Sequence, residues 1–356
     1  MTILGSRIDA ASQFPAFFNP RWVRLMHRVG RSTKAELVLV RDLPLAPTAI
    51  HVGRRLGIPV VLDMAENYPA MIRDLWTTDS TKFGDRLVRN PKAVEAVERW
   101  TLRRVDHTLV VVEESRDRLV EELGVDPGAI TVVGNTPSLD RMDREQAPKT
   151  PTDKSGSDPT APLRLIYLGL LEHARGLGAI IEAVAICRER GVPVKLTVIG
   201  DGRASDDFRR QAGSLGLTES QIHFHGYVAY EQALRLLEQS EVGVIPHLPN
   251  ESWNTTIPNK LFDYMAAGLA ILTSEARPTR RVAEATGAGM WFEGGNPASA
   301  ADAVERLQRE GSVDEMGQRG RSAVQERFNW ERDQERLLQA IEGCGSGTGA
   351  DPLAGT

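Results

Sequence analysis

Cysteine is scarce in this chain of 356 residues, which contains only Cys187 and Cys344. Cys187 lies in a segment with helical spacing and Cys344 in a Gly-rich tail, so the pair suggests neither a disulfide framework nor a zinc site. A reducing cytoplasm is the compartment that fits this cysteine usage.

Long apolar runs and an excess of basic residues are also lacking. No stretch approaches the roughly 18 consecutive apolar residues of a membrane-spanning helix. The first ten residues, MTILGSRIDA, have neither the basic start nor the apolar core of a signal peptide. The formal net charge is -5, whereas nucleic-acid binders need a basic surface that neutralises phosphates. The sequence therefore predicts a cytoplasmic protein that is neither exported nor membrane-spanning and that binds no nucleic acid.

The chain has the length and the pattern of two α/β domains. At 356 residues it is too long for one ordinary core and suits two domains of about 150 residues each. In the first half, apolar runs such as AELVLVRD (35–42) and IPVVLDM (58–64) alternate with segments of helical spacing. Strands separated by helices indicate βαβ units, and hence a doubly wound parallel sheet covered on both faces.

A change of composition separates the two halves. Residues 143–162 are rich in Pro, Ser, Thr and charge and have no apolar periodicity, which is typical of a linker. The alternation of strands and helices then starts again. We therefore predict a Rossmann-like N-terminal domain at 1–142, a second Rossmann-like domain at 163–328, a C-terminal helix at 329–342 and a disordered tail at 343–356.

One segment of the second half, NTTIPNKLFDYMAAGLAILTS (254–274), predicts a turn, a helix and a buried strand. Pro258 suits the first turn of this helix and Gly268 its end. The start of the helix is expected to face a ligand cleft between the two domains, at the carboxyl ends of the strands. There Lys260 predicts a phosphate site, and Asp263 could accept hydrogen bonds from two adjacent sugar hydroxyls. The alternative is that both charges lie solvated on an amphipathic face.

Three stretches together resemble a known family. They are TTIPNKLFDYMAAGLAILTS (255–274), YLGLLEHARGLGAIIEAV (167–184) and LTVIGDGR (196–203). In this order and spacing they are similar to the nucleotide-sugar half of glycosyltransferase family 4, and residues 58–71 and 103–135 resemble its acceptor-side domain. The resemblance implies the GT-B fold, with two Rossmann-like domains facing a cleft, and a transferase that uses a nucleotide-sugar donor.

The resemblance also implies which residues bind the donor. Asp263 stands where the second acid of the family's paired-glutamate motif holds the ribose, whereas the first acid is replaced by Thr255, which leaves recognition of the transferred sugar open. Backbone N–H groups between Ile257 and Lys260 are expected to hold the diphosphate. The full set of expected donor-binding residues is Gly169, Gly176, Thr256, Ile257, Pro258, Asn259, Lys260 and Asp263.

The loop GLLEHARG (169–176) keeps one of the family's two basic residues. Leu170 replaces the first, and Arg175 takes the place of the second. The forked donors of Arg175 suit a phosphate, and the alternative is a surface charge at the start of a helix. Gly169 and Gly176 are expected to allow close approach of the backbone.

A histidine that is common in the family after the strand equivalent to PVVLDM is replaced here by Ala65, followed by Glu66. Retaining transferases of this type react on one face of the sugar, and the protein mainly positions the reactants and stabilises the departing diphosphate. The resemblance therefore implies Arg175, Lys260 and Glu66 as catalytic residues. Glu66 or Asp63 would orient sugar or acceptor, unless either acid only pairs with a neighbouring helix. No metal and no cofactor besides the donor substrate are expected.

The start of the chain departs from the family. Members begin with a strand, a Gly-rich loop and a helix, whereas MTILGSRID (1–9) resembles the end of a later, inner strand. Two hypotheses follow: the real start lies upstream, or the domain is truncated and inactive.

The next segment, NPRWVRLMHRVGRSTK (19–34), is basic and amphipathic. Such segments lie on anionic membranes, and the alternative is a core helix with a solvated basic face. Its basic residues are Arg21, Arg24, His27, Arg28, Arg31 and Lys34. If the membrane interpretation holds, the protein works at the inner face of the membrane on a lipid-linked sugar or a growing polysaccharide.

The sequence thus predicts a retaining, hexosyltransferase-type enzyme that moves a sugar from a nucleotide-diphosphate sugar to a glycan or lipid-linked acceptor in polysaccharide or glycolipid biosynthesis. Two alternatives stay open. One is a nucleotide-sugar epimerase of the same architecture, and the other is a catalytically degenerate homologue that binds nucleotide or a partner protein.

Overall fold

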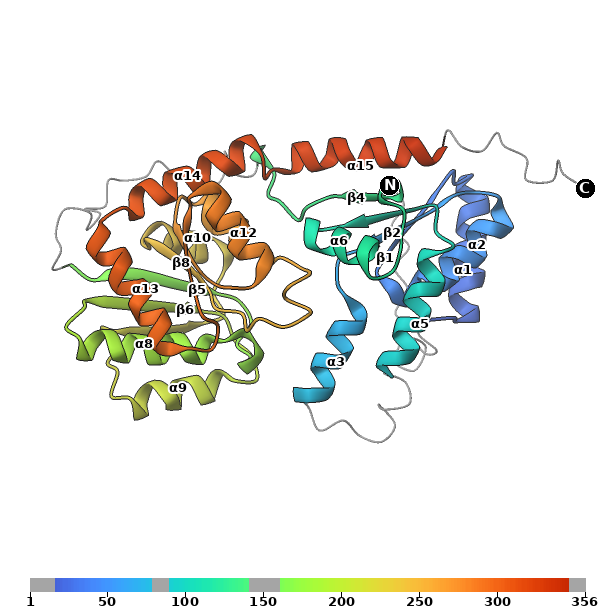
Figure 1. The fold of residues 1–356 in the computed structure, drawn as a ribbon. Helices are drawn as coiled ribbons and strands as arrows, with labels where there is room; N and C mark the ends of the chain where they lie inside the picture. The colour runs from blue at the N-terminus through green and yellow to red at the C-terminus, as the bar shows by residue number, and fades with distance from the viewer. Residues whose placement is uncertain (1–16, 79–89, 141–160, 346–356) are drawn as a thin grey trace, which may run out of the picture. The chain divides into compact units, whose positions relative to one another are not determined.

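The computed structural model (Figure 1) describes three ranges of the chain, residues 17–78, 90–140 and 161–345. The chain divides into two compact units: unit 1 comprises Met1–Val133 and Gln334–Thr356, and unit 2 comprises Gly134–Asp333. The predicted strand at 1–9 lies outside the described residues, and so does the predicted linker at 143–162 except for its last two positions.

Unit 1 is built on a four-stranded parallel sheet with the order β1-β2-β3-β4. Its strands are β1 (Val38–Arg41), β2 (Val60–Met64), β3 (His107–Val110) and β4 (Ile130–Val132). Its helices are α1 (Pro20–Thr33), α2 (Ala46–Leu56), α3 (Tyr68–Thr78), α5 (Pro91–Leu102) and α6 (Glu113–Glu121), and part of α15 (Trp330–Gly345) joins them. The described residues of this unit also form the 3-10 turns η2 (Leu43–Leu45) and η3 (Pro127–Ala129).

Successive residues of β2 point to opposite faces of this sheet, as strand geometry requires. Leu62 belongs to a cluster with Ile50 of α2, and Val61 belongs to another with Ala340 of α15. Both faces of the sheet are therefore covered by helices, and the predicted doubly wound α/β architecture is confirmed for the first half.

The C-terminal helix is longer than the sequence predicted. Cys344, expected in a disordered tail from 343, lies within α15 and packs against the cluster of Val61, Leu109 and Ala340. Leu337, Ala340 and Cys344 follow one another at helical spacing, so all three lie on one apolar stripe. The tail beyond Gly345 lies outside the described residues.

The limit between the units also differs from the predicted limit at residue 142. The division falls after Val133, because the following residues bond to the region just before and within the start of α15. Thr136 Oγ1 donates to Asp333 Oδ2 at 2.6 Å, and the N–H of Trp330 donates to the carbonyl of Pro137 at 2.9 Å.

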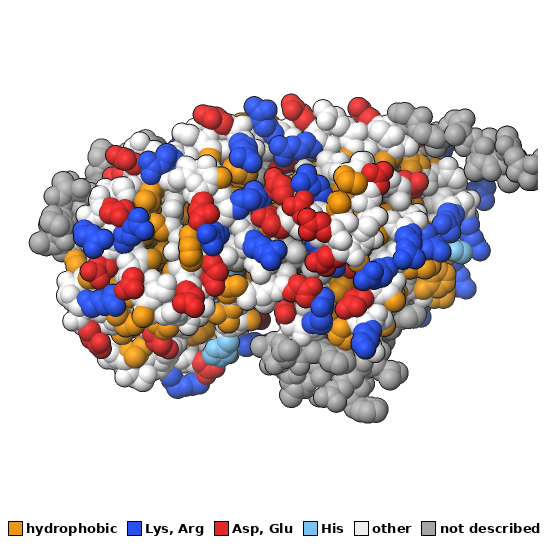
Figure 2. Space-filling view, in the orientation of Figure 1, with side chains coloured by type: hydrophobic (Ala, Val, Ile, Leu, Met, Phe, Trp, Pro, Cys, Tyr) orange, Lys and Arg blue, Asp and Glu red, His pale blue; other side chains and the backbone are white. Residues whose placement is uncertain are grey.

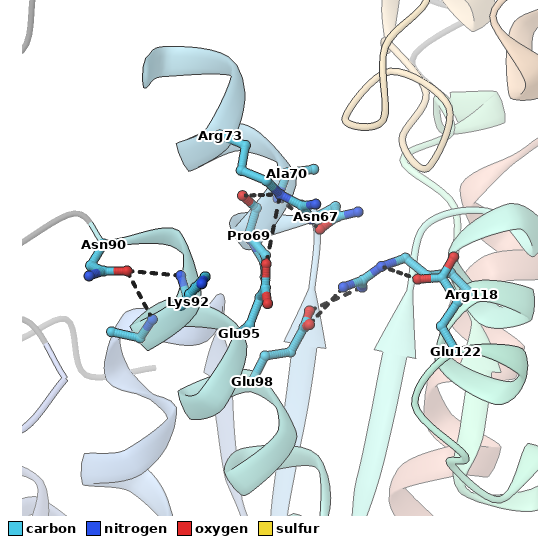
Figure 3. Close-up of polar contacts among 11 residues, drawn as sticks. Asn67, Pro69, Ala70, Arg73, Asn90, Lys92, Glu95, Glu98, Arg118 and Glu122 are labelled. Atoms are coloured by element: carbon cyan, nitrogen blue, oxygen red, sulfur yellow. Dashed lines mark hydrogen bonds and ion pairs between the residues drawn. The ribbon is translucent and has the colours of Figure 1, made fainter. Parts of the chain in front are cut away.

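A buried ion pair joins two helices of unit 1. The guanidinium of Arg118 on α6 donates to both carboxylate oxygens of Glu98 on α5, at 3.0 and 2.6 Å (Figure 3). The side chains are only 6% and 1% exposed. Glu95, also on α5, forms a looser and more exposed pair with Arg73 of α3 at 3.9 Å.

Unit 2 contains a six-stranded parallel sheet with the order β10-β9-β8-β5-β6-β7. Its strands are β5 (Leu163–Leu168), β6 (Val194–Ile199), β7 (Ile222–Gly226), β8 (Val242–Ile245), β9 (Ala270–Ser274) and β10 (Gly289–Phe292). Its helices are α8 (Leu177–Glu189), α9 (Ser205–Ser214), α10 (Tyr230–Glu238), α11 (Lys260–Ala266), α12 (Arg277–Thr286), α13 (Pro297–Glu310) and α14 (Val313–Glu326), and η5 (His173–Arg175) is a 3-10 turn.

The main core of unit 2 lies between the sheet and the helices α8, α9 and α13. Leu165 and Tyr167 of β5 face this core together with Phe208 of α9. Ile166, which points to the other face, is fully buried as well. The second half is therefore also a parallel sheet covered on both faces, as predicted.

The strand order of unit 2 determines where a ligand can bind. From β5 the chain moves outward to β6 and β7, and it then crosses to the other side of β5 to form β8, β9 and β10. The switch point thus lies between β5 and β8. In open α/β sheets, ligands bind at such a switch point, outside the carboxyl ends of the strands.

Candidate functional site

Lys260 is the first residue of α11, and it is buried. Only 7% of the residue is exposed, and its Nζ lies 4.2 Å from the centre of the Tyr167 ring on β5. Among the described residues, Nζ has no hydrogen-bond partner. Burial, and then the charge of Arg175, lower the pKa of Lys260 to about 7. For Lys260, the alternative of a solvated surface charge is therefore wrong.

The position of Lys260 follows from the residue one turn later. Tyr264 is fully buried and packs over Gly243, and its hydroxyl accepts a hydrogen bond from the N–H of Leu168 on β5 at 2.8 Å. Residues four apart lie on the same side of a helix, so this bond also directs Lys260 toward the carboxyl end of β5. Asp263 is half-buried on the same helix.

Pro258 does not lie in the first turn of α11, contrary to the prediction. The helix begins two residues later, and Asn259 is its N-cap residue. The carbonyl of Pro258 accepts a hydrogen bond from the N–H of Leu261 at 3.1 Å. This bond closes a turn between residues i and i+3. Gly268 follows the helix in a left-handed conformation with φ of 72°, as expected for a helix end.

Arg175, in the loop after β5, belongs to the same site as Lys260. Its guanidinium lies 5.6 Å from the centre of the Trp253 ring, and its charge lowers the pKa of Lys260 and of His247. The structure thus brings Arg175 and Lys260 together at the carboxyl end of β5. Leu170, which takes the place of the family's other basic residue, is 44% exposed.

His247 is a site residue that the sequence analysis missed. It lies two residues after the end of β8, it is 1% exposed, and both its ring nitrogens lack hydrogen-bond partners among the described residues. Its ring stacks on Trp253 at 3.8 Å. Burial, Lys260 and Arg175 lower its pKa well below the usual value. Its place at the end of a central strand was the signal that could have revealed it.

The loop before α11 is closely packed. Thr255 and Thr256 are buried, as is Ile257. Thr255 Oγ1 donates to the carbonyl of Glu251 at 2.9 Å. The hydroxyl at the position of the family's first acid is thus used in the turn, and the Ile257 side chain is buried.

Glycine is required at two positions of the site. Gly169 has φ of 148°, and a Cβ there would lie 3.1 Å from Lys260 Nζ. Gly176 has φ of 75°, and a Cβ there would lie 1.8 Å from the carbonyl oxygen of Pro246. At both glycines the close neighbour is another part of the protein and not a ligand. The contact between Gly176 and Pro246 holds the loop of Arg175 against the segment that carries His247.

Replacing Gly176 by alanine is expected to lower the free energy of unfolding by about 3 kcal/mol or more, because a strained left-handed φ adds to a backbone clash. Gly191 is the matched control. It has φ of 71° with nothing within 4 Å of an added Cβ, so Gly191→Ala should cost only about 1 kcal/mol. Urea unfolding followed by circular dichroism measures both, and equal costs would contradict the packing described here.

Glu66, like Asp63, lies in unit 1, whereas Arg175, Lys260 and the expected donor-binding residues lie in unit 2. It is exposed in the loop between β2 and α3. Asn67, which follows it, is buried and accepts a hydrogen bond from the N–H of Ala70 at 3.2 Å, which caps α3 (Figure 3). Asp63 pairs with Arg41 of the neighbouring strand β1 at 2.7 Å, so its partner is on a strand and not on a helix.

The predicted basic helix at the start of the described chain is present as α1. Arg21, Arg24, Arg28 and Arg31 are exposed on it, and α1 packs against α2. Figure 2 shows Lys and Arg side chains gathered over this end of unit 1. Within the described ranges, no helix has both the length and the apolar character that crossing a membrane requires.

Two family models match the chain in succession. Residues 4–136 match the model described as "Glycosyl transferase 4-like domain", and residues 162–310 match the model described as "Glycosyl transferases group 1". Between them the two matches cover most of both units.

Curated relatives are transferases of several kinds. The chain is 25% identical to a glycogen synthase of Mycobacterium tuberculosis over 68% of its own length and 58% of the relative's. It is 27% identical to the amylovoran biosynthesis glycosyltransferase AmsK of Erwinia amylovora over 51% and 45%. The chain thus matches about half the length of these relatives.

Solved structures share the fold. Anabaena Alr3699/HepE in complex with UDP superposes with a TM-score of 0.71 at 12% identity, over 90% of this chain and 82% of that one. A glycosyltransferase from Rickettsia africae gives a TM-score of 0.71 at 11% identity, over 97% and 85%. At such low identities the likeness establishes the two-domain GT-B fold alone.

Proposed function

Because this chain belongs to the group 1 glycosyltransferases of family 4, we propose that it transfers a sugar from a nucleotide-diphosphate sugar to an acceptor hydroxyl with retention of configuration. The observation that carries the proposal is the pair of basic side chains, Arg175 and Lys260, at the switch point of unit 2. Lys260 is buried without a partner, and a diphosphate would supply the missing counter-charge.

The proposed chemistry uses this pair to stabilise the leaving group. The bond between the sugar's anomeric carbon and the phosphate oxygen breaks, negative charge develops on the diphosphate, and Arg175 and Lys260 stabilise that charge. The acceptor oxygen attacks from the face that the diphosphate leaves, and the departing phosphate takes the acceptor proton. Asp263 would hold the ribose, and Glu66 would orient the acceptor or the sugar.

We propose a glycan or a lipid-linked sugar as the acceptor, because of a groove on the surface of unit 1. A groove of about 610 Å³ there is lined mainly by apolar residues, among them Phe18, Ile50 and Trp100, and its edge carries Arg54 and Arg55. With the exposed arginines of α1, this surface suits an anionic amphiphile, and such a surface would hold the protein at a membrane's inner face.

A thermal-shift panel of UDP, GDP, ADP and their sugar conjugates tests donor binding, since a ligand that binds only the folded state raises the melting temperature. We expect a shift with one base. UDP is the first to try because Alr3699/HepE forms a UDP complex. Asp263→Asn should weaken binding of that nucleotide by about tenfold, because a charge-assisted hydrogen bond is lost. Folded protein that shifts with none of these nucleotides would contradict the proposal.

The degenerate homologue stays a second candidate because of Thr255. Its hydroxyl is used within the turn, so it does not replace the missing acid. Release of nucleotide diphosphate from the bound donor on addition of an acceptor extract separates the two: binding without release would favour the homologue that only binds.

A further inference from the structure

Two buried polar side chains at the switch point are left unsatisfied by the protein. Lys260 Nζ and both ring nitrogens of His247 lack hydrogen-bond partners within the described ranges, although the residues are only 7% and 1% exposed. Buried polar groups in folded proteins are almost always hydrogen-bonded, and an isolated buried charge is strongly unfavourable. The unsatisfied groups of Lys260 and His247 therefore indicate a ligand site. They also indicate that the amine of Lys260 is not fully charged while the site is empty.

The groups that face Lys260 carry no negative charge. From β5 comes the uncharged ring of Tyr167, 4.2 Å from Nζ, with Gly169 beyond it. The loop after β5 contributes the cation of Arg175, and the segment after β8 contributes His247. On its own helix, Asp263 lies one turn further.

No carboxylate among the described residues raises the pKa of Lys260. Glu172 acts on the hydroxyl of Tyr167, but only burial and Arg175 act on the amine of Lys260, and both lower its pKa. The empty site thus holds one permanent cation, Arg175, and an amine that is partly neutral near pH 7.

We propose that the donor's diphosphate binds at this site together with one proton, which the amine of Lys260 takes up from solution. This inference rests on the proposed function, because the ligand is the nucleotide-sugar donor. The negative charge of the diphosphate favours the ammonium form, so the occupied site has two cations against the ligand's two negative charges. No covalent bond of the protein changes.

His247 takes no proton in this account. Burial and the two neighbouring cations keep its pKa well below the usual value, and a second cation at Lys260 opposes its protonation further. A neutral imidazole has one N–H donor and one acceptor nitrogen, so His247 can donate to a phosphate oxygen without a charge of its own.

The expected proton uptake depends on pH. With a pKa of about 7 in the empty site, the amine is mostly neutral at pH 8 and mostly protonated at pH 6. Binding should therefore take up most of a proton per site at pH 8 and much less at pH 6. Donor affinity should fall as pH rises from 7 to 8.5.

Isothermal titration calorimetry in buffers of different ionisation enthalpy, HEPES and Tris, measures this uptake at both pH values. The probe is the UDP-, GDP- or ADP-sugar that the thermal-shift panel selects, because its diphosphate bridge does not titrate in this range. We expect the observed enthalpy to depend on the buffer at pH 8 and hardly at pH 6. Binding with the same heat in both buffers at pH 8 overturns the inference and leaves the proposed function standing, whereas no binding at all overturns the proposed function.

Two variants assign the proton. Lys260→Arg keeps a cation that does not titrate, so its binding should lose both the buffer dependence and the pH dependence. His247→Gln should bind more weakly but still take up the proton at pH 8. Uptake that disappears in His247→Gln, or that persists in Lys260→Arg, would contradict the assignment to Lys260.

Discussion

Lys260→Met is expected to lower the rate of sugar transfer by about 10²- to 10³-fold, the usual effect of removing one group that stabilises charge in a transition state. The same change should not lower the melting temperature. The wild-type amine is buried without a partner, and methionine fills similar space with no polar atom to satisfy. Loss of activity combined with retained or increased stability is the signature of a residue that serves the ligand.

The gain in stability should depend on pH in a defined direction. The pKa of Lys260 is lowered from 10.5 to about 7 in the folded protein, so between these values the unfolded chain binds more protons than the folded one. The penalty of burying the amine is therefore fully present below about pH 7 and fades as pH rises toward 10.5. Differential scanning calorimetry of Lys260→Met and wild type should show the larger difference at pH 6 and a smaller one at pH 9.

Arg309→Met is the control for both measurements. Arg309 is exposed in the last turn of α13, so its replacement should change neither the transfer rate nor the pH dependence of stability. A Lys260→Met protein that transfers sugar at the wild-type rate, or that melts well below wild type at pH 6, would contradict the role given to Lys260.

The second large effect is expected in unit 1, at the ion pair that joins α5 and α6 (Figure 3). Glu98→Leu should lower the free energy of unfolding by about 3–5 kcal/mol, because Arg118 would keep a buried charge whose remaining ion pair, with the exposed Glu122, is 3.8 Å long. Adding Arg118→Met should restore most of that loss, since it removes the stranded charge. Urea unfolding followed by circular dichroism measures both.

Glu95→Leu provides a matched control on the same helix. Its pair with Arg73 is 3.9 Å long and more than one-third exposed on both sides, and exposed pairs contribute about 0–1 kcal/mol. If Glu98→Leu and Glu95→Leu destabilised the protein equally, the Glu98–Arg118 pair would not be the buried tie between α5 and α6 that the structure indicates.

The fold was predictable because every strand that the sequence analysis used is an apolar run between turn residues. IPVVLDM and the end of the 254–274 segment became β2 and β9, each buried on both faces. The end of the C-terminal helix was predicted too early. Cys344 continues the apolar stripe of α15, but the glycines around it in the sequence suggested a tail.

The candidate site was predictable only in part. Helical spacing located Lys260 at a helix start, but the spacing fits a solvated charge equally well. Its burial depends on the bond from the N–H of Leu168 to Tyr264, which joins segments 96 residues apart in the chain. His247 escaped notice for a similar reason, because two of its neighbours, Lys260 and Arg175, come from α11 and from the loop after β5.

The central claim is that the donor's diphosphate binds between Arg175 and Lys260 at the carboxyl ends of β5 and β8. The most direct test is calorimetric titration at pH 7 of the nucleotide diphosphate selected by thermal shift into wild type, Arg175→Met, Lys260→Met and Arg309→Met. We expect affinities at least about tenfold weaker for Arg175→Met and Lys260→Met, since each loses a charge-assisted bond, and wild-type affinity for Arg309→Met. Equal affinity in all four proteins would contradict the central claim, because the nucleotide would then bind elsewhere.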